Sequence, residues 1–295
     1  MTSATREARS TIQALCVPGS PVSGCVPRWR KPSRLSCRRT AGCGQSMAWC
    51  GAGCGQACRH CRACASRLCS SLASCSAADA RAGVIQAAAL HAPSWGHAEI
   101  LATEWLQPKP EVSAHVQALY PNAQAIFRER YADSLEPEFM AVCEELAEAG
   151  PLWFGRDQEP QCLIHGDFRL DNMLFDIKGG AEEIAVLDWQ TVAIGSGLTD
   201  IGYFLGTGIG DDLRRAHEAE LLDLYCAEMT ARDVALTRDA IWDDYVIGAL
   251  HGISTAVFSA AYVERTERGD ANFLSMARGG CALALQHGSI AKLRG

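Results

Sequence analysis

The stretch 162–190 constrains the fold more than any other part of the chain, because three short apolar runs there are separated by turn-forming and charged residues. The runs occupy 162–164, 173–175 and 184–187, and Lys-Gly-Gly at 178–180 supplies a turn between the second and the third. Short runs of apolar and β-branched residues bounded by turn residues are typical of strands. The pattern predicts a small sheet whose strand ends carry polar residues, where loops can present them to a ligand.

Helical periodicity surrounds this stretch on both sides. A helix is predicted within 77–95, with Pro93 ending it, and another within 134–150, with Ser134 as its cap and Gly150 as its stop. Further helices are predicted at about 211–230, 239–265 and 270–288. The chain is therefore predicted to be mainly helical around one small sheet.

The net charge of −7 conceals two parts of opposite character. Residues 1–75 carry eleven Arg or Lys and one acid, whereas 76–295 carry 16 basic and 33 acidic residues. Eleven of the 15 cysteines also lie before Ser76. Residues 1–75 show no sustained strand or helix period, so we predict a Cys- and Arg-rich low-complexity segment there, followed by one folded domain over 76–295.

No run of roughly 18 or more apolar residues is present, and the N-terminus lacks the apolar core of a secretory signal. We therefore expect a soluble cytoplasmic protein. The four later cysteines, at 143, 162, 226 and 281, fit the buried thiols of a reducing compartment.

A group of polar residues follows the first and third apolar runs. They are His165, Gly166, Asp167 and Asn172, in the pattern H-G-D-x-x-x-x-N, and Asp188 in "LDW". In phosphoryl-transfer sites an Asp orients the hydroxyl, while an Asn and a second Asp hold Mg²⁺ against the phosphates. These side chains supply the oxygen ligands that Mg²⁺ prefers. The spacing predicts such a site; the alternative is that these are capping and turn residues of an ordinary α/β domain.

From about Ser76 to its end, the chain resembles the aminoglycoside phosphotransferase and choline kinase superfamily, and looks closest to its ecdysteroid-kinase-like (CHK kinase-like) branch. The resemblance is carried by "HGDFRLDNMLF", "VLDWQ" and "LTDIGYFL", and "AAALHAPSWG" supports it. It implies an α+β, protein-kinase-like fold with a mainly helical C-terminal lobe and a small β-hairpin at the active site. It also implies that Asp167 is the catalytic base and that Asn172 and Asp188 bind Mg²⁺ and, through it, ATP.

The resemblance implies roles for three further residues. His165 would brace the catalytic loop, and Asp200, which opens "DIGYFL", would tie its helix to that loop. Arg169 lies two residues after the base, where protein kinases place a phosphate-contacting Lys. For Arg169 and Asp200, a solvated charge or a helix cap is the competing interpretation.

The implied fold needs a smaller N-terminal lobe, with a Gly-rich loop over the phosphates and a Lys paired to a Glu. Lys31 is the only Lys before Lys109, and no strand pattern surrounds it. Three glycines cluster at 51–55 without β-rich flanks, and Glu7, in the short helical stretch 6–15, is the candidate for the paired Glu. We therefore expect the N-terminal β lobe to be missing or degraded.

Two hypotheses account for residues 16–75. The first is a metal-binding insertion, since a run of cysteines and one histidine could hold zinc or an iron–sulfur cluster: Cys54, Cys58, His60, Cys61 and Cys64. The second, which we favour, is that the segment is not an evolved protein sequence, because Arg, Ala, Gly, Pro, Cys and Ser dominate when GC-rich DNA is read out of frame.

The sequence thus predicts an ATP-dependent phosphotransferase acting on a hydroxyl of a small molecule, with a catalytically inactive kinase-like remnant or binding protein as the alternative. The scattered basic residues form no motif for specific nucleic-acid recognition, and no membrane partner is expected. Acids at 211, 212, 243 and 244 could attract a cationic acceptor, although exposed helical acids are usually only solvating. The acceptor and the oligomeric state are not readable from the sequence.

Overall fold

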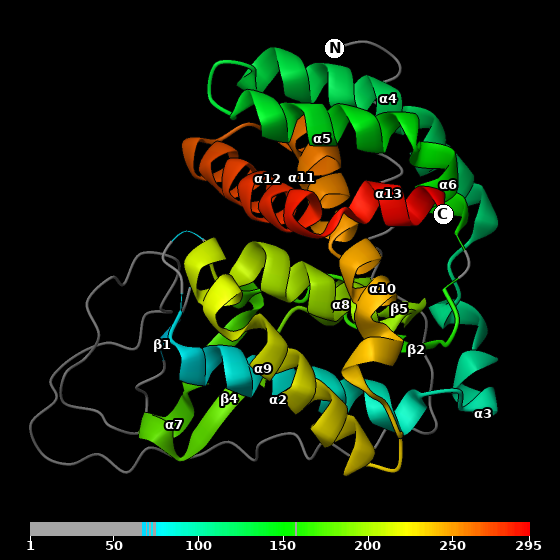
Figure 1. The fold of residues 1–295 in the computed structure, drawn as a ribbon, viewed down its shortest axis with the longest axis vertical. Coiled ribbons are helices and arrows are strands. Elements are labelled where there is room, and N and C mark those ends of the chain that lie inside the picture. The colour runs from blue at the N-terminus through cyan, green and yellow to red at the C-terminus, as the bar shows by residue number, and fades with distance from the viewer. Residues whose placement is uncertain (1–66, 69, 71, 73–74, 157) are drawn as a thin grey trace, which may run out of the picture.

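The computed structural model describes residues 67–68, 70, 72, 75–156 and 158–295 (Figure 1). It is mainly helical, with two small antiparallel sheets, so the predicted α+β class and the helical C-terminal lobe are confirmed. Lys31, Glu7, the glycines at 51–55 and the cysteines at 54–64 lie outside the described residues, and so does most of the predicted low-complexity segment. The boundary between 75 and 76 stays a prediction.

The helices fall into two layers, with α2, α8 and α9 in one and α4, α5, α11, α12 and α13 in the other (Figure 1). Their bounds are α2 Ala77–His91, α3 Ala98–Leu101, α4 Pro110–Tyr131, α5 Pro137–Glu148, α6 Gly150–Gly155, α8 Gly197–Tyr203, α9 Asp211–Thr230, α10 Arg238–Gly248, α11 Leu250–Tyr262, α12 Glu267–His287 and α13 Ser289–Arg294. A single π-helical segment, Phe204–Gly208, continues α8.

The three predicted strands are present, but they belong to two sheets rather than to the one small sheet that was predicted, and two further strands join them. β3 (Met173–Asp176) pairs with β4 (Glu182–Val186), while β2 (Cys162–Ile164) pairs with the unpredicted β5 (Ala193–Gly195). The two-residue strand β1, Arg67–Leu68, adds to the outer side of β3. The turn at 178–180 lies in the short element α7 (Ile177–Gly180). Its backbone is left-handed at Lys178 and Gly179, which explains its Gly-rich sequence.

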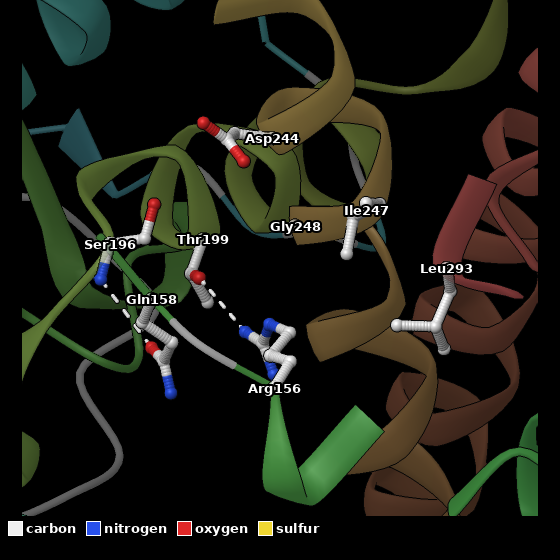
Figure 2. Close-up of a pocket in the computed structure, with 8 residues that line it drawn as sticks. All are labelled: Arg156, Gln158, Ser196, Thr199, Asp244, Ile247, Gly248 and Leu293. Carbon is white, nitrogen blue, oxygen red and sulfur yellow. Dashed lines mark hydrogen bonds between the residues drawn. The ribbon is translucent and has the colours of Figure 1, made fainter. Parts of the chain in front are cut away.

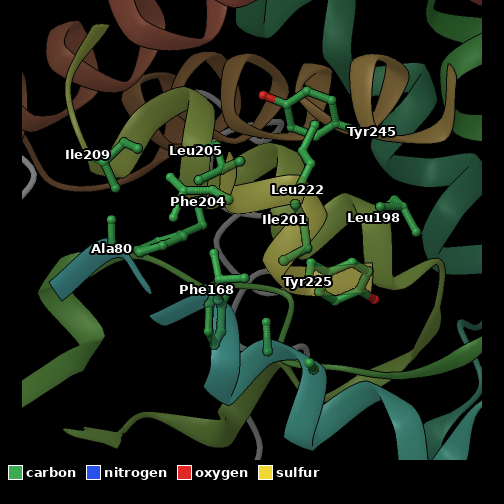
Figure 3. Close-up of a cluster of buried hydrophobic side chains, with 14 of the residues drawn as sticks. Ala80, Phe168, Leu198, Ile201, Phe204, Leu205, Ile209, Leu222, Tyr225 and Tyr245 are labelled. Atoms are coloured by element: carbon green, nitrogen blue, oxygen red, sulfur yellow. The ribbon is translucent and has the colours of Figure 1, made fainter. Parts of the chain in front are cut away.

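Figure 3 shows the first core, where buried side chains of α8 meet those of α2, α9 and the loop after β2. Phe168, Ile201, Phe204 and Tyr225 are each fully buried there. The second core joins α4, α5, α11 and α12. Because α8 contributes to the first core and Tyr203 at its end to the second, that helix is fixed from both sides.

Three details of the helix predictions were wrong. The helix within 134–150 begins at Pro137 with Glu136 as its N-cap, so Ser134 is not the cap. The single helix predicted at 239–265 is two helices that meet at Ala249. The 22-residue helix α4 was not predicted at all; it contains Pro121, which normally disfavours a helix interior.

The α10–α11 segment, residues 238–262, is long and apolar enough to cross a membrane by length and composition alone. However, 72% of the apolar 18-residue window in this segment is buried inside the protein, as in the core helix of a globular domain. The four cysteines after residue 76 are buried and carry free thiols, as predicted.

Candidate active site

The loop after β2 presents Asp167 with both carboxylate oxygens held. The Tyr203 hydroxyl donates to Oδ1 at 3.0 Å, and Asn172 Nδ2 donates to Oδ2 at 2.8 Å and to the Asp167 carbonyl at 2.9 Å. The side chain remains 23% exposed, so a substrate can still reach it. The carboxylate is thus fixed in orientation and accessible, which are the two requirements of a positioned base.

The β3–β4 hairpin brings the two predicted metal ligands to neighbouring strand ends. Met173 is paired with Val186, and the Leu187 amide donates to the Asn172 carbonyl at 2.8 Å. Asp188 comes next, with φ of 62°, and its side chain is exposed. The left-handed backbone, unusual for a residue other than Gly, redirects the chain at the end of β4.

The side chains of Asn172 and Asp188 offer oxygen atoms of the kind that bind a magnesium ion. The Asn172 amide nitrogen is committed to Asp167, which leaves the amide oxygen to face a cation. Within the described part of the chain, no group of three or more His, Cys, Asp or Glu side chains could hold a metal. Mg²⁺ commonly takes only one or two protein ligands and completes its shell with phosphate oxygens and water. Asn172 and Asp188 fit that mode of binding.

His165 braces the loop through both ring nitrogens. Nδ1 accepts from the Asp167 amide at 3.2 Å, and Nε2 lies 2.9 Å from the Leu187 carbonyl. Since a carbonyl only accepts, Nε2 carries the proton and the ring is neutral in this arrangement. The ring is fully buried, and the Trp189 ring packs edge-on against it at 4.9 Å. His165 therefore links the base loop to the end of β4, without direct access to a substrate.

Asp200 ties α8 to the same loop, as the sequence resemblance implied. Its carboxylate accepts from the amides of His165 at 2.6 Å and Gly166 at 2.9 Å, and His91 Nε2 lies 3.3 Å away. Burial alone would raise the pKa of Asp200, but the hydrogen bonds from His91 and the two amides bring it below its ordinary value. Asp200 thus stays ionised inside the protein and holds the turn before the base.

Gly166 is required by this turn. Its φ is +78°, and a Cβ placed there would lie 2.7 Å from the Thr191 carbonyl oxygen. Thr191 also donates its hydroxyl to the His165 carbonyl at 2.8 Å. Any other residue would force the loop away from the segment after β4.

Arg169 packs beside the base. Its Nε lies 3.0 Å from Asp167 Oδ1, and its Nη1 lies 3.8 Å from Asp171. Burial would lower the pKa of Arg169, but the neighbouring negative charges raise it, so the guanidinium remains charged. Its predicted contact with a phosphate stays a prediction.

Sequence reasoning missed three residues that hold the loop. Tyr203 is bonded to Asp167, and burial raises its pKa well above the ordinary value, which keeps its hydroxyl protonated as a donor. His251 Nε2 lies 2.9 Å from the Gly166 carbonyl. His91 joins Asp200 to Tyr225, whose hydroxyl lies 3.0 Å from Nδ1. Tyr203 and His91 both fall inside quoted motifs, but only the fold reveals what they contact.

Two of the four acids considered for a cationic acceptor form ion pairs. Asp211 bonds Arg214 and Arg215, and Asp243 bonds Lys292. These pairs leave little uncompensated negative charge for an acceptor at those two positions.

Comparisons with known proteins bear on the resemblance of the whole chain to other proteins. Residues 104–236, somewhat less than half of the chain, match the model of the ecdysteroid kinase-like family. Among curated proteins, mouse acyl-CoA dehydrogenase family member 10 is 40% identical over 68 residues, which are 23% of this chain and 6% of that protein. Human acyl-CoA dehydrogenase family member 11 is 55% identical over 42 residues, 14% of this chain and 5% of that protein. The matches thus span a small part of those relatives.

A solved structure from Ralstonia eutropha, named as an aminoglycoside phosphotransferase, covers 75% of this chain and 70% of its own. Its identity is 16% and the TM-score is 0.45, too low to establish a shared fold by itself. The family match does bear on the prediction made from the motifs. It confirms the predicted resemblance: over residues 104–236 the chain is similar to the ecdysteroid kinase-like family.

Proposed function

We propose that this protein is an ATP-dependent phosphotransferase that acts on a hydroxyl of a small molecule in the cytoplasm, without specific nucleic-acid or membrane partners. The family match supports the coarser part, a kinase-like protein suited to phosphoryl transfer. The observation that carries the proposal is the Asp167 carboxylate, which is oriented by Tyr203 and Asn172 yet partly exposed.

In the proposed reaction, Asp167 orients the acceptor hydroxyl and takes its proton as the oxygen attacks the terminal phosphate. Tyr203 and Asn172 restrict the carboxylate to one orientation, which lowers the entropic cost of reaching the reactive geometry. Asn172 and Asp188 would hold Mg²⁺, whose charge offsets that of the phosphates when it is bound. His165 and Asp200 keep the loop in place and do not touch the reacting atoms.

The competing candidate is a kinase-like protein without activity. It is favoured by one sequence observation, the lack of a recognisable Gly-rich loop and paired Lys before Lys109. The two candidates differ in whether the protein binds Mg²⁺·ATP.

Thermal unfolding of the whole chain with and without Mg²⁺·ATP tests this difference. At about 100 times the dissociation constant, a ligand stabilises the folded state by about 2.7 kcal/mol. We expect that shift in the native protein and its loss in Asp188→Ala. Asp176→Ala is the matched control, because Asp176 also ends a strand with positive φ and is exposed. A cooperatively folded protein without any shift would favour the inactive candidate.

A further inference from the structure

A cavity of about 150 Å³ lies where the loop after α6 meets α8, α10 and α13 (Figure 2). None of the five predicted site residues lines it. A water-sized position takes roughly 10 to 15 Å³ of such volume, so the cavity accommodates about ten non-hydrogen atoms. It is large enough for a small metabolite but not for a nucleotide.

Arg156 supplies a positive charge to this cavity. Its guanidinium donates to the Trp153 carbonyl at 2.8 Å and to the Thr199 hydroxyl at 3.3 Å, and it stacks 3.5 Å from the Trp153 ring. All of these partners are neutral, and across the described residues no carboxylate forms an ion pair with Arg156. Burial lowers the pKa of Arg156 to about 10, and the charge of Asp244 across the cavity opposes this only in part. An anion entering the cavity would meet a guanidinium without a direct ion-pair partner among the described residues.

Asp244 supplies a negative charge at the opposite side of the cavity (Figure 2). Lys292 of α13 is bonded to the neighbouring residue Asp243. Burial and the charge of Asp243 raise the pKa of Asp244, and Arg156 offsets this only in part. Among the described residues Asp244 has no ion-pair partner, so it offers a site for a cation.

Between the two charges the walls differ in polarity. Thr199 places its hydroxyl group beside Arg156, whereas Ile247 and Leu293 form an apolar wall (Figure 2). Hydroxyl and guanidinium donors together suit a carboxylate, since Arg binds carboxylates through two parallel hydrogen bonds. An apolar wall beside them suits a hydrocarbon side chain.

We propose that this cavity binds a free α-amino acid with an apolar side chain. Its carboxylate pairs with Arg156 beside Thr199, its ammonium group pairs with Asp244, and its side chain packs on Ile247 and Leu293. A molecule carrying both charges satisfies both groups at once, whereas a singly charged one leaves one of them unpaired.

The bound amino acid acts on the catalytic loop through α8. Thr199 directly precedes Asp200, whose carboxylate holds the amides of His165 and Gly166. Gly248, which also lines the cavity, packs against the backbone of α8 at Leu198. Binding of the amino acid therefore restricts the motion of α8, which in turn holds the loop that carries Asp167. The cavity is thus an effector site.

Isothermal titration of the whole chain tests the binding, without depending on the proposed kinase activity. The probes are L-leucine, 4-methylpentanoate, which lacks the ammonium group, and 3-methylbutylamine, which lacks the carboxylate. We expect saturable binding of leucine and at least about tenfold weaker binding of both analogues. Loss of one hydrogen bond to a charged group costs about 1.5 to 3 kcal/mol, or roughly 10- to 100-fold in affinity.

Two variants locate the site. Arg156→Gln and Asp244→Asn are each expected to weaken leucine binding by about 10- to 100-fold, while the matched controls Arg128→Gln and Asp223→Asn leave it unchanged. Because Arg156 stacks on Trp153, its replacement can disturb folding; Asp244 lies on the exposed rim and gives an independent answer. The proposal is overturned if folded protein does not bind leucine saturably, if 4-methylpentanoate binds equally well, or if Asp244→Asn binds like the native chain.

Hydrogen exchange measures the coupling. Leucine should slow exchange of the His165 and Gly166 amides in the native protein and have no effect in Asp244→Asn. Unchanged exchange at saturating leucine would refute the effector role.

Discussion

The Asp167 carboxylate shares one oxygen between Tyr203 and Arg169, while the other accepts from Asn172. A carboxylate with this many partners is held rigidly, and its remaining exposed lone pair is the position available to a substrate hydroxyl.

Replacing Asp167 by Ala should lower turnover by about 10²- to 10⁴-fold, the usual effect of removing a general base. Steady-state kinetics with an acceptor found by screening would measure it. Asp167→Asn, which retains the size of the side chain, should be comparably impaired while unfolding at the native temperature. Turnover near the native rate in either variant would show that Asp167 is not the base.

Tyr203→Phe removes only the hydroxyl that donates to Asp167. A hydrogen bond to a charged group is worth about 1.5 to 3 kcal/mol, so we expect kcat to fall roughly tenfold or more with little change in KM. Tyr262→Phe is the control, because its hydroxyl contacts Asn122 and Leu119, in the second core. Equal kcat values in the two variants would reduce Tyr203 to a packing role.

At the level of elements, α8 is the central support of the site. It carries Asp200 and Tyr203, and its backbone lies directly against α10. The close approach depends on Gly248, where a Cβ would come within 2.3 Å of the Leu198 carbonyl oxygen. Backbone atoms cannot move aside as a flexible side chain does, so the two helices would have to separate.

Gly248→Ala should therefore reduce the free energy of unfolding by about 1 to 3 kcal/mol, as overpacking usually does. Chemical denaturation would measure it. Gly155→Ala is the matched control: nothing lies within 4 Å of its added Cβ, and its effect should be neutral or slightly stabilising. If Gly248→Ala were as stable as the control, the α8–α10 contact would be looser than described.

Across the whole molecule, several buried or paired groups make stability depend on pH. Burial lowers the pKa of His251 from 6.5, so the unfolded chain binds this proton more readily and stability falls as pH drops below about 6.5. The pKa of Asp200 lies below 3.8 in the folded state, through the hydrogen bonds from His91 and the loop amides, despite burial. The stabilising contribution of Asp200 is fully present above the unfolded pKa of 3.8 and is lost as pH falls through the lower pKa of the folded state.

We therefore expect two phases in the pH dependence of the free energy of unfolding, measured by denaturation from pH 8 to pH 3. A first decline should begin near pH 6.5, and a steeper one below about pH 4. His251→Gln, which can still donate to the Gly166 carbonyl, should flatten the first decline and retain the second. A first decline that persists in this variant would assign it to other groups.

Much of the site could be predicted because its residues are close in sequence. The H-G-D-x-x-x-x-N spacing, the hairpin and "LDW" lie within 162–190, so local periodicity and turn residues were enough to place Asp167, Asn172 and Asp188 at strand ends. The helix α4 escaped prediction because Pro121 argues locally against it, while its packing against α5 and α11 stabilises it. Ser134 is not the cap because the helix begins later, at Pro137. A proline is favourable at that first position, since its fixed φ suits the start of a helix.

The sequence by itself thus determined the class of fold, the resemblance to a kinase-like family and the residues proposed for the loop that carries Asp167. Only the tertiary structure decided what holds that loop: Tyr203 and His251 reach it from 36 and 85 positions away. It also brought Arg156 and Asp244 to opposite sides of one cavity. The physical reason is that backbone conformation follows local side-chain sterics and hydrogen bonding, whereas a contact between distant residues exists only after helices have packed and buried their apolar faces.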